Sequence, residues 1–332
     1  MSKPSVSFVI PYYKVEIGLL ARAVESIMRL GDRADWEVWV VDDGTPGREA
    51  EEFVGQLAEL RVHYVAQENA GLGGARNTGM ELATKDFVQF LDADDYLFTT
   101  PALALLRLME THADAEFVAF DFRKTYDTNL HDMPLPEWHI LCEGSGTDIM
   151  LRQNLRGGAW GYVFRKEVLG KLRFTPGIYH EDEEFSPQLL LNTRRGIVTD
   201  LPVYAYYQRR DSIVHQADRR VVEKRFSDFL GIIVRLSAKT RELEGDAAAA
   251  MVRRTDMLRM AMAYTLMCDS PDTAFLTGFL KRMRQAGLYP LAPRCYSLPY
   301  FIVRTCSLFP LWAAITRKLL QILHLRHVKR AS

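Results

Sequence analysis

The chain has 332 residues, of which 48% are hydrophobic and 25% charged, and its 42 Lys and Arg residues balance 42 Asp and Glu residues. This composition excludes an intrinsically disordered chain, which would have fewer aromatic and β-branched residues, and it excludes collagen-like and disulfide-dense proteins, which are richer in Gly, Pro or Cys. The length fits one large domain with an appendage, or two domains that share an interface.

The first 120 residues alternate short β-rich runs with helical patterns, which is typical of an α/β layer fold with a mainly parallel sheet. We expect strands at residues 6–10, 36–41, 62–66, 87–91 and 117–122. The spacing of apolar residues predicts helices between these strands, at 19–27, up to about 60, at 75–83 and at about 103–110. The glycine-rich stretch before the third helix is expected to be a loop.

Regular patterns weaken between residues 123 and 146 and then return. We expect a strand around 160–164, a helix that opens at 180–184 and runs to 191, and a strand at 203–207. Two amphipathic helices follow at 219–244 and 247–267. The sequence therefore predicts an α/β domain over residues 1–218 and a helical C-terminal region over 219–332.

The cysteines and the N-terminus favour a cytoplasmic protein. The apolar stretch Val6–Ile10 is too short for a signal peptide and is ended by Pro11, and no window of about 20 residues is free of charges or helix breakers. The four cysteines lack the spacing of a zinc site, so we expect reduced, mostly buried thiols. They are Cys142, Cys268, Cys295 and Cys306.

Acidic residues cluster at three places, two of them directly after predicted strands, where open α/β sheets bind ligands. The clusters are Asp42 and Asp43; Asp92, Asp94 and Asp95; and Glu181, Asp182, Glu183 and Glu184. Because clustered carboxylates repel one another, a folded protein keeps them near a cation, near basic groups or in water. The Asp92-x-Asp94 spacing suits a hard divalent ion, which shares its oxygen ligands with substrate phosphates, and this indicates a nucleoside diphosphate.

Each cluster also has a purely structural interpretation. Asp42-Asp43-Gly44 is typical of a turn with solvated acids, Asp94-Asp95 of a helix N-cap, and Glu181–Glu184 of a helix start that is stabilised by the macrodipole. The glycines of Gly71–Gly74 superficially resemble a dinucleotide-binding fingerprint. We exclude a nicotinamide enzyme because Arg76 takes the place of the third glycine and the segment follows the third strand.

Four motifs, in this order and spacing, together resemble the family 2 inverting glycosyltransferases. They are VSFVIPYY at 6–13, VVDDGT at 40–45, NAGLGGARNTG at 69–79 and FLDADD at 90–95. Downstream, EDEEF at 181–185 resembles the acidic motif that carries the catalytic base, and YYQRRDSI at 206–213 resembles the segment that follows it in bacterial members. The resemblance covers residues 4–215, and the C-terminal third carries no family signature.

The resemblance implies a GT-A fold, in which a Rossmann-like, mainly parallel sheet is flanked by helices and binds UDP or another nucleotide across the carboxyl ends of its first strands. Pro11 and Tyr12 would line the base and ribose pocket. Asp42 would accept hydrogen bonds from the base, and Arg76 would lie near the nucleotide. Asp92 would approach the ribose.

The resemblance also implies a metal and a base. Asp94 would bind the divalent ion, Mn²⁺ or Mg²⁺, that bridges the two phosphates, and Asp95 is the weaker metal candidate. Transfer with inversion needs a carboxylate that takes the proton of the acceptor hydroxyl. Asp182 fits this role best, but Glu181 stays open as the base, because consecutive residues at a helix start point in different directions.

Three further residues have two interpretations each. Trp160 stands where family members often carry a Trp and would either stack on a sugar ring or belong to the core. His180 would contact a phosphate or sugar hydroxyl, or merely precede the helix. Asn77 would contact the nucleotide or start a helix. Gly161 and Tyr162 stand where the family often has polar or basic residues, so donor and acceptor preference stay open.

Charge is segregated along the chain, because Asp272 is the last acidic residue and ten basic residues follow it. These are Lys281, Arg282, Arg284, Arg294, Arg304, Arg317, Lys318, Arg326, Lys329 and Arg330. Basic amphipathic helices with aromatic residues commonly lie in the interface of anionic membranes, so an anionic membrane surface is an expected partner. The expected acceptor is a glycan, and with such an attachment it would be a lipid-linked glycan. Alternatively, these helices pack on the first domain. No nucleic-acid-binding motif accompanies the charge.

The sequence thus predicts a metal-dependent, inverting glycosyltransferase of hexosyl or N-acetylhexosaminyl type that uses a UDP-sugar. We expect it to act in capsular, extracellular or lipopolysaccharide assembly, peripherally on the inner face of the cell membrane. A sugar-nucleotide nucleotidyltransferase is an alternative, although no glycine-and-basic loop for a triphosphate lies near the N-terminus. A non-catalytic carbohydrate-binding protein is another, although it would have no need to retain Glu181 and Asp182.

Overall fold

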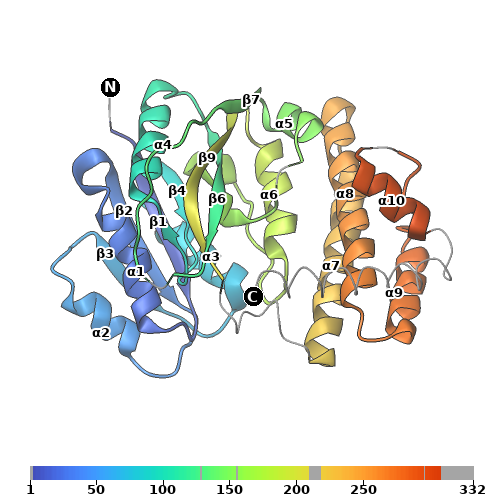
Figure 1. The fold of residues 1–332 in the computed structure, drawn as a ribbon, viewed down its shortest axis with the longest axis horizontal. Helices are drawn as coiled ribbons and strands as arrows, with labels where there is room; N and C mark the ends of the chain where they lie inside the picture. The colour runs from blue at the N-terminus through green and yellow to red at the C-terminus, as the bar shows by residue number, and fades with distance from the viewer. Residues whose placement is uncertain (1–2, 128, 155, 209–217, 295, 308–332) are drawn as a thin grey trace. The chain divides into compact units, whose positions relative to one another are not determined.

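The computed structural model describes residues 3–127, 129–154, 156–208, 218–294 and 296–307. The chain divides into two compact units, Met1–Gln216 and Ala217–Ser332, and each is described by itself (Figure 1). Three parts of the sequence predictions lie outside the described residues. They are residues 209–213 of the motif at 206–213, Cys295, and the basic residues that follow residue 307. Cys142 and Cys268 are free thiols, as expected.

The first unit is built on a mixed sheet, which has nine strands among the described residues. The strands are β1 (Ser5–Tyr12), β2 (Asp35–Asp42), β3 (Val62–Ala66), β4 (Phe87–Phe90), β5 (Tyr96–Leu97), β6 (Phe117–Thr125), β7 (Ile140–Gly144), β8 (Tyr162–Arg165) and β9 (Gly196–Tyr207). Their order is β3-β2-β1-β4-β8-β6-β9-β5, and β7 pairs with β9. The four strands β3, β2, β1 and β4 are parallel, so their carboxyl ends meet at one edge, whereas β8 is antiparallel to both neighbours.

Helices cover both faces of this sheet (Figure 1). They are α1 (Ile17–Met28), α2 (Glu49–Gln56), α3 (Gly71–Leu82), α4 (Thr99–Thr111), α5 (Gly146–Arg152) and α6 (Glu181–Leu191). Alternate residues of a strand point to opposite faces. Phe8 and Ile10 of β1 share a buried cluster with Leu20 of α1. Val9 faces α3, where a Cβ on Gly79 would lie 2.1 Å from its Cγ1.

Strand β1 runs through Pro11 to Tyr12, two residues beyond the predicted end. Pro11 pairs with Val41 of β2 but lies past Val9, the last residue of β1 that pairs with β4. The backbone polar groups of successive residues in a strand point alternately to its two neighbours. The carbonyl oxygen of Val9 accepts a hydrogen bond on the β4 side and that of Tyr12 accepts one on the β2 side. The nitrogen of Pro11, two residues after Val9, therefore faces the side where β4 has ended. Its missing N–H therefore costs no sheet hydrogen bond.

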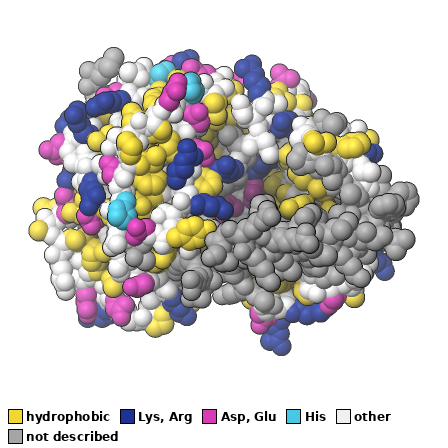
Figure 2. Space-filling view, in the orientation of Figure 1, with side chains coloured by type: hydrophobic (Ala, Val, Ile, Leu, Met, Phe, Trp, Pro, Cys, Tyr) yellow, Lys and Arg dark blue, Asp and Glu magenta, His cyan; other side chains and the backbone are white. Residues whose placement is uncertain are grey.

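Charged side chains of both signs are mixed on one face of the first unit. Figure 2 shows Lys and Arg interspersed with Asp and Glu on the face that it presents. Exposed ion pairs join close neighbours, such as Arg29 with Glu25 at 2.7 Å and Arg48 with Glu51 at 2.8 Å. Such pairs contribute little to stability.

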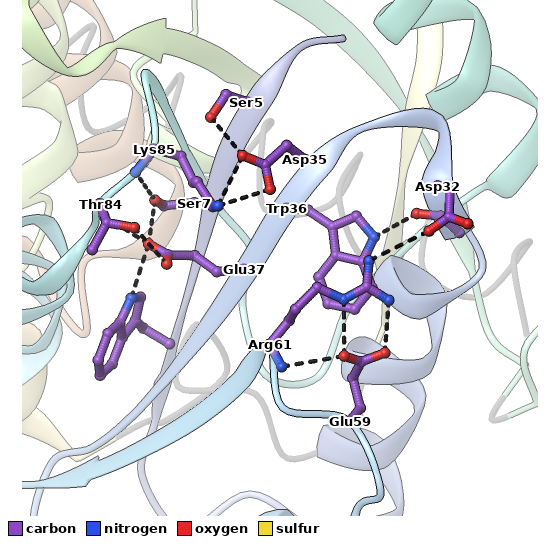
Figure 3. Close-up of polar contacts among 12 residues, drawn as sticks. Ser5, Ser7, Asp32, Asp35, Trp36, Glu37, Glu59, Arg61, Thr84 and Lys85 are labelled. Atoms are coloured by element: carbon purple, nitrogen blue, oxygen red, sulfur yellow. Dashed lines mark hydrogen bonds and ion pairs between the residues drawn. The ribbon is translucent and has the colours of Figure 1, made fainter.

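A polar network ties the amino ends of β1 and β2 to the turn before β4 (Figure 3). The carboxylate of Glu37, 6% exposed, accepts hydrogen bonds from Ser7 Oγ at 2.7 Å, from Trp39 Nε1 at 3.1 Å, and from the backbone N–H and Oγ1 of Thr84, both at 2.7 Å. Burial by itself raises the pKa of Glu37, but these hydrogen bonds outweigh it and hold the pKa below its usual value. The network lies at the edge opposite the strand-end acids, so its role is structural.

The second unit is helical: α7 (Arg219–Thr240), α8 (Gly245–Asp269), α9 (Thr273–Gln285) and α10 (Leu298–Ser307). The buried acid Asp256 of α8 anchors the segment after α9, because it accepts a hydrogen bond from Tyr296 Oη at 2.8 Å and lies 3.4 Å from Arg294 Nη1. Within the described ranges, no helix combines the length and the hydropathy that a bilayer-crossing segment needs.

Candidate active site

The carboxyl ends of β1 and β2 bring three predicted residues together. Tyr12 and Asp42 are paired in register, directly after Pro11 and its partner Val41. The side chain of Tyr12 is 2% exposed, and its hydroxyl donates to the carbonyl oxygen of Val15 at 2.8 Å. Burial, and next the charge of Asp42, raise the pKa of Tyr12, so its hydroxyl stays protonated.

Asp42 is held by hydrogen bonds to both carboxylate oxygens. Oδ1 accepts from the N–H of Thr45 at 2.8 Å, and Oδ2 accepts from Tyr64 Oη at 3.0 Å. Burial and this hydrogen bond raise the pKa of Tyr64 to about 12, so Tyr64 acts as a donor. Each carboxylate oxygen has a second lone pair, which leaves Asp42 able to accept a hydrogen bond from a ligand.

Asp43 starts helix α3, a role that the sequence did not reveal. Its side chain is 3% exposed, and its two oxygens accept from the backbone N–H groups of Ala70 and Gly71, both at 2.8 Å, and from Gln67 Nε2 at 2.8 Å. The expected helix start at Ala75 is therefore wrong, and α3 begins at Gly71. Only the fold brings these donors, 24 to 28 residues further along the chain, to Asp43.

Arg76 of α3 joins two of the acidic clusters. Its side chain is 1% exposed, Nη1 donates to Glu181 Oε1 at 2.7 Å, and Nη2 donates to Asp92 Oδ1 at 3.0 Å. Burial alone would lower the pKa of Arg76, but the charges of Asp92 and Glu181 outweigh it, so the guanidinium stays charged. Both terminal nitrogens of Arg76 therefore have protein partners. That Arg76 lies near a nucleotide stays a prediction.

Asp95 is a buried acid with two donors. Its side chain is 1% exposed, Oδ2 accepts from Tyr204 Oη at 2.7 Å, and Oδ1 accepts from the N–H of Tyr207 at 2.7 Å. It does not cap the following helix α4, whose N-cap residue is Phe98. Burial, followed by the charges of Asp94 and Asp92, raises the pKa of Asp95 well above its usual value.

Asp92 and Asp94 are the partly exposed acids of this loop. The loop is fixed from α1 by Arg22, which is 4% exposed and donates from Nη2 to the carbonyl oxygen of Asp94 at 2.5 Å. Among the described residues, no group of three or more His, Cys, Asp or Glu side chains is placed to hold a metal ion. The carboxylate oxygens of Asp92 and Asp94 fit a divalent ion that takes one or two protein carboxylates and completes its coordination shell with phosphate and water.

The first turn of α6 places its two base candidates differently. His180, the N-cap residue, has a left-handed backbone with φ of 63°, and the helix begins at Glu181 as predicted. Glu181 is 4% exposed, and burial raises its pKa to about 7 although Arg76 lies at 2.7 Å. Asp182 is partly exposed, and its Oδ1 accepts from the N–H of Glu183 at 2.9 Å.

Trp160 lies in an aromatic stack. Its ring stacks on those of Tyr204 and Tyr206, with centroids at 4.5 and 5.7 Å and interplanar angles of 26°, and it packs edge-to-face with Phe122, with centroids 5.1 Å apart. It is partly buried and packs against the main core. This matches the core interpretation of Trp160, and sugar binding by Trp160, like that by His180, stays a prediction.

Comparisons with known proteins agree with the motifs. Residues 7–173 match the family model described as glycosyl transferase family 2. This span contains the predicted residues from Pro11 to Trp160 and ends before α6, so Glu181 and Asp182 lie outside it.

Two curated bacterial proteins are similar over part of their length. The uncharacterized glycosyltransferase YibD of Escherichia coli is 29% identical over 189 residues, which are 53% of this chain and 54% of YibD. The succinoglycan biosynthesis protein ExoW of Rhizobium meliloti is 44% identical over 94 residues, which are 27% of this chain and 29% of ExoW. The chain therefore spans about half of the first relative and under a third of the second.

A solved structure shares the fold. Residues 1–349 of TarS from S. aureus, in complex with UDP-GlcNAc, superpose with a TM-score of 0.62 and 16% identity, covering 98% of this chain and 92% of that one. At this identity the likeness shows the fold alone.

Proposed function

This chain belongs to glycosyl transferase family 2 and has the GT-A fold, and from that premise we propose that it is an inverting transferase. It moves a hexosyl or N-acetylhexosaminyl group from a UDP-sugar to an acceptor hydroxyl. The observation that carries the proposal is the meeting of Asp92 and Glu181 on Arg76, which brings the strand-end acids next to the first turn of α6. We assign the catalysis to residues 1–218.

The nucleotide lies, in this proposal, at the carboxyl ends of β1, β2 and β4. Asp42 accepts a hydrogen bond from the base, Pro11 and Tyr12 line the pocket, and Asp92 approaches the ribose. Support comes from the position of these residues at the edge where open α/β sheets bind ligands and from the UDP-GlcNAc complex of TarS, which has the same fold.

We assign the metal ligand to Asp94. Asp95 is the poorer ligand, because its side chain is 1% exposed and held by Tyr204 and Tyr207, whereas Asp94 is partly exposed. A bound Mn²⁺ or Mg²⁺ supplies Lewis-acid stabilisation of the charge on the departing diphosphate. Support for a cation comes from the grouping of Asp92 and Asp94 in one loop, because clustered carboxylates repel one another unless a cation or basic groups lie near them.

Asp182 is the base in this mechanism. Its carboxylate takes the proton of the acceptor hydroxyl while the hydroxyl oxygen forms a bond to the anomeric carbon. The bond from that carbon to the diphosphate oxygen breaks with inversion, and the nucleoside diphosphate leaves with the electron pair. Glu181 is buried and bound to Arg76, so it holds the helix start rather than reaching the acceptor.

We place the reaction in the assembly of a bacterial polysaccharide or lipopolysaccharide, with a glycan or lipid-linked glycan as acceptor. The name of ExoW, a succinoglycan biosynthesis protein, supports this class of product. The excess of basic residues after Asp272 supports peripheral attachment to the inner face of the cell membrane.

The test is release of UDP from UDP-sugars, beginning with UDP-N-acetylglucosamine, with Mn²⁺, with Mg²⁺ and with a chelator. We expect metal-dependent UDP release and a higher melting temperature with UDP and Mn²⁺, because a ligand that binds the folded state stabilises it. Pyrophosphate release from a sugar phosphate and UTP would instead establish a nucleotidyltransferase. Binding of sugars with no turnover of any nucleotide sugar would establish a carbohydrate-binding protein.

A further inference from the structure

The segment that leads into α6, residues 174–181, is attached to one face of α3. The N–H of Gly177 donates to the carbonyl oxygen of Ala70 at 3.1 Å. The side-chain amide of Asn77 makes two hydrogen bonds with the backbone of Phe174, donating to its oxygen at 2.9 Å and accepting from its N–H at 2.8 Å. Asn77 lies inside α3, so the prediction that it starts the helix is wrong.

Gly73 lets the segment approach α3 closely. A Cβ at this position would lie 3.0 Å from Phe174 Cβ, 3.1 Å from the carbonyl oxygen of Thr175 and 3.2 Å from Glu181 Cγ. These contacts are tighter than ordinary van der Waals packing, so a Cβ here requires the segment to shift by a few tenths of an ångström. Residues three and four apart share a helix face, which puts Ala70, Gly73 and Asn77 in one row under the segment.

Both ends of the segment are fixed. Phe174 is 2% exposed and stacks on Phe185 of α6, with centroids 3.8 Å apart and an interplanar angle of 11°. At the other end, Arg76 binds the carboxylate of Glu181 at 2.7 Å. Asp182 is the next residue along the chain, so its position depends on this attachment.

We propose that the face of α3 formed by Gly73, Arg76 and Asn77 positions the catalytic carboxylate. Gly73 and Asn77 are positioning residues that set where the first turn of α6 begins, and Arg76 locks that turn to Asp92. The inference rests on the proposed function, because the placement of Asp182 matters for turnover only if Asp182 is the base.

The first experiment compares Gly73→Ala with Gly55→Ala. Both substitutions replace a glycine inside a helix, but a Cβ on Gly55 of α2 would meet nothing within 4 Å. We expect Gly73→Ala to lower kcat for UDP release about tenfold, because a shift of a few tenths of an ångström is smaller than the displacement of about 1 Å that can cost about a hundredfold. The affinity for UDP, measured by calorimetry, stays within about twofold of wild type. Gly55→Ala keeps wild-type values of both.

The second experiment keeps the inference testable if Gly73→Ala folds poorly. Asn77→Ala removes both hydrogen bonds to Phe174, whereas the control Asn192→Ala removes a hydrogen bond from the far end of α6 to the carbonyl of Val168, 2.9 Å long. We expect the same loss of kcat with preserved UDP affinity in the first variant and not in the second. Equal kinetics in variant and control, or UDP affinity that falls in proportion to kcat, overturns the inference.

Amide hydrogen exchange separates this inference from the proposed function. In Gly73→Ala and Asn77→Ala, exchange in residues 174–184 is expected to speed up relative to both controls, because local opening becomes easier when attachments are lost. Unchanged exchange there refutes the positioning role whether or not the protein releases UDP. Wild-type protein that turns over no UDP-sugar refutes the proposed function instead. If exchange is still faster in the two variants, the attachment of residues 174–181 to α3 stands even then.

Discussion

Two neighbouring carboxylates at the start of α6 differ in their surroundings, and this difference supports the roles proposed for them. Glu181 is 4% exposed, and burial raises its pKa to about 7. Its ionised form is bound by Arg76, which also binds Asp92. Asp182 is partly exposed. An acceptor hydroxyl can reach a partly exposed carboxylate without breaking a buried ion pair, which is why we propose Asp182 as the base.

We therefore predict that Asp182→Asn lowers transfer about 100-fold or more, because general-base catalysis contributes roughly 10²- to 10⁴-fold. Binding of UDP with Mn²⁺ should persist, since Asp182 is not assigned to the nucleotide. Initial rates of UDP release and calorimetry with UDP measure the two effects. A fully active Asp182→Asn protein beside an inactive Glu181→Gln protein would exchange the roles of the two residues.

Glu37 gives a prediction about stability and pH. Its pKa is below the usual 4.5 in the folded protein, so the unfolded chain binds its proton more readily. The stability that Glu37 contributes is therefore complete above pH 4.5 and is lost as the pH falls through the folded pKa. Glu37→Gln should cost about 1–3 kcal/mol at neutral pH, because an amide cannot accept all four hydrogen bonds. The difference from wild type in urea unfolding should shrink in acid, and a constant difference would contradict this account.

At the scale of elements, the sequence predicted most of the helices and strands that a local pattern of residues marks. The strand at 62–66 and the start of α6 at Glu181 are confirmed, because alternation of apolar residues and a cluster of acids mark them within a few residues. Helix α3 starts earlier than predicted, because glycine is a poor helix former and the missing stabilisation comes from Asp43 in a distant loop.

The residues of the candidate site also divide into those that local patterns reveal and those that only the fold brings into place. Residues at strand ends could be placed from the order of the elements alone, and Asp42 lies at the expected edge. Arg22, Asn77 and Tyr204 were missed or misread, because each acts on a segment between 72 and 112 residues away in the sequence. Contacts at such separations exist only once the sheet has formed, and no spacing rule predicts them.

Helix α3 gives the prediction at this scale. Asp43→Ala leaves the N–H groups of Ala70 and Gly71 without their acceptor, so it should lower the free energy of unfolding by about 2 kcal/mol. Asp32→Ala is the control, because the Asp32 side chain is 94% exposed and a surface change is worth about 0.5 kcal/mol or less. Urea unfolding of both variants is the measurement. If the two are equally stable, Asp43 does not hold the helix start.

At the scale of the whole molecule, the net charge of zero conceals two regions of opposite sign. Residues 1–272 hold all 42 acidic residues and 32 of the 42 basic ones, and the ten others follow Asp272. On the face shown in Figure 2 the described charges of the first unit are mixed. The basic excess after Asp272 is uncompensated by any acid in that stretch. Attraction to an anionic surface is therefore expected of the C-terminal region and not of the first unit.

Reversing two exposed charges of α9 tests this expectation. Lys281→Glu with Arg284→Glu should weaken binding to phosphatidylcholine vesicles that contain phosphatidylglycerol by at least about tenfold, because each basic residue near such a surface contributes about 1 kcal/mol. The control reverses Arg33 and Lys171, two exposed basic residues of the first unit, and should bind like wild type. Binding of the wild type should also fall as salt rises, since exposed charges are screened. Equal flotation of the two double variants would remove the membrane from the proposed function and leave the transferase assignment untouched.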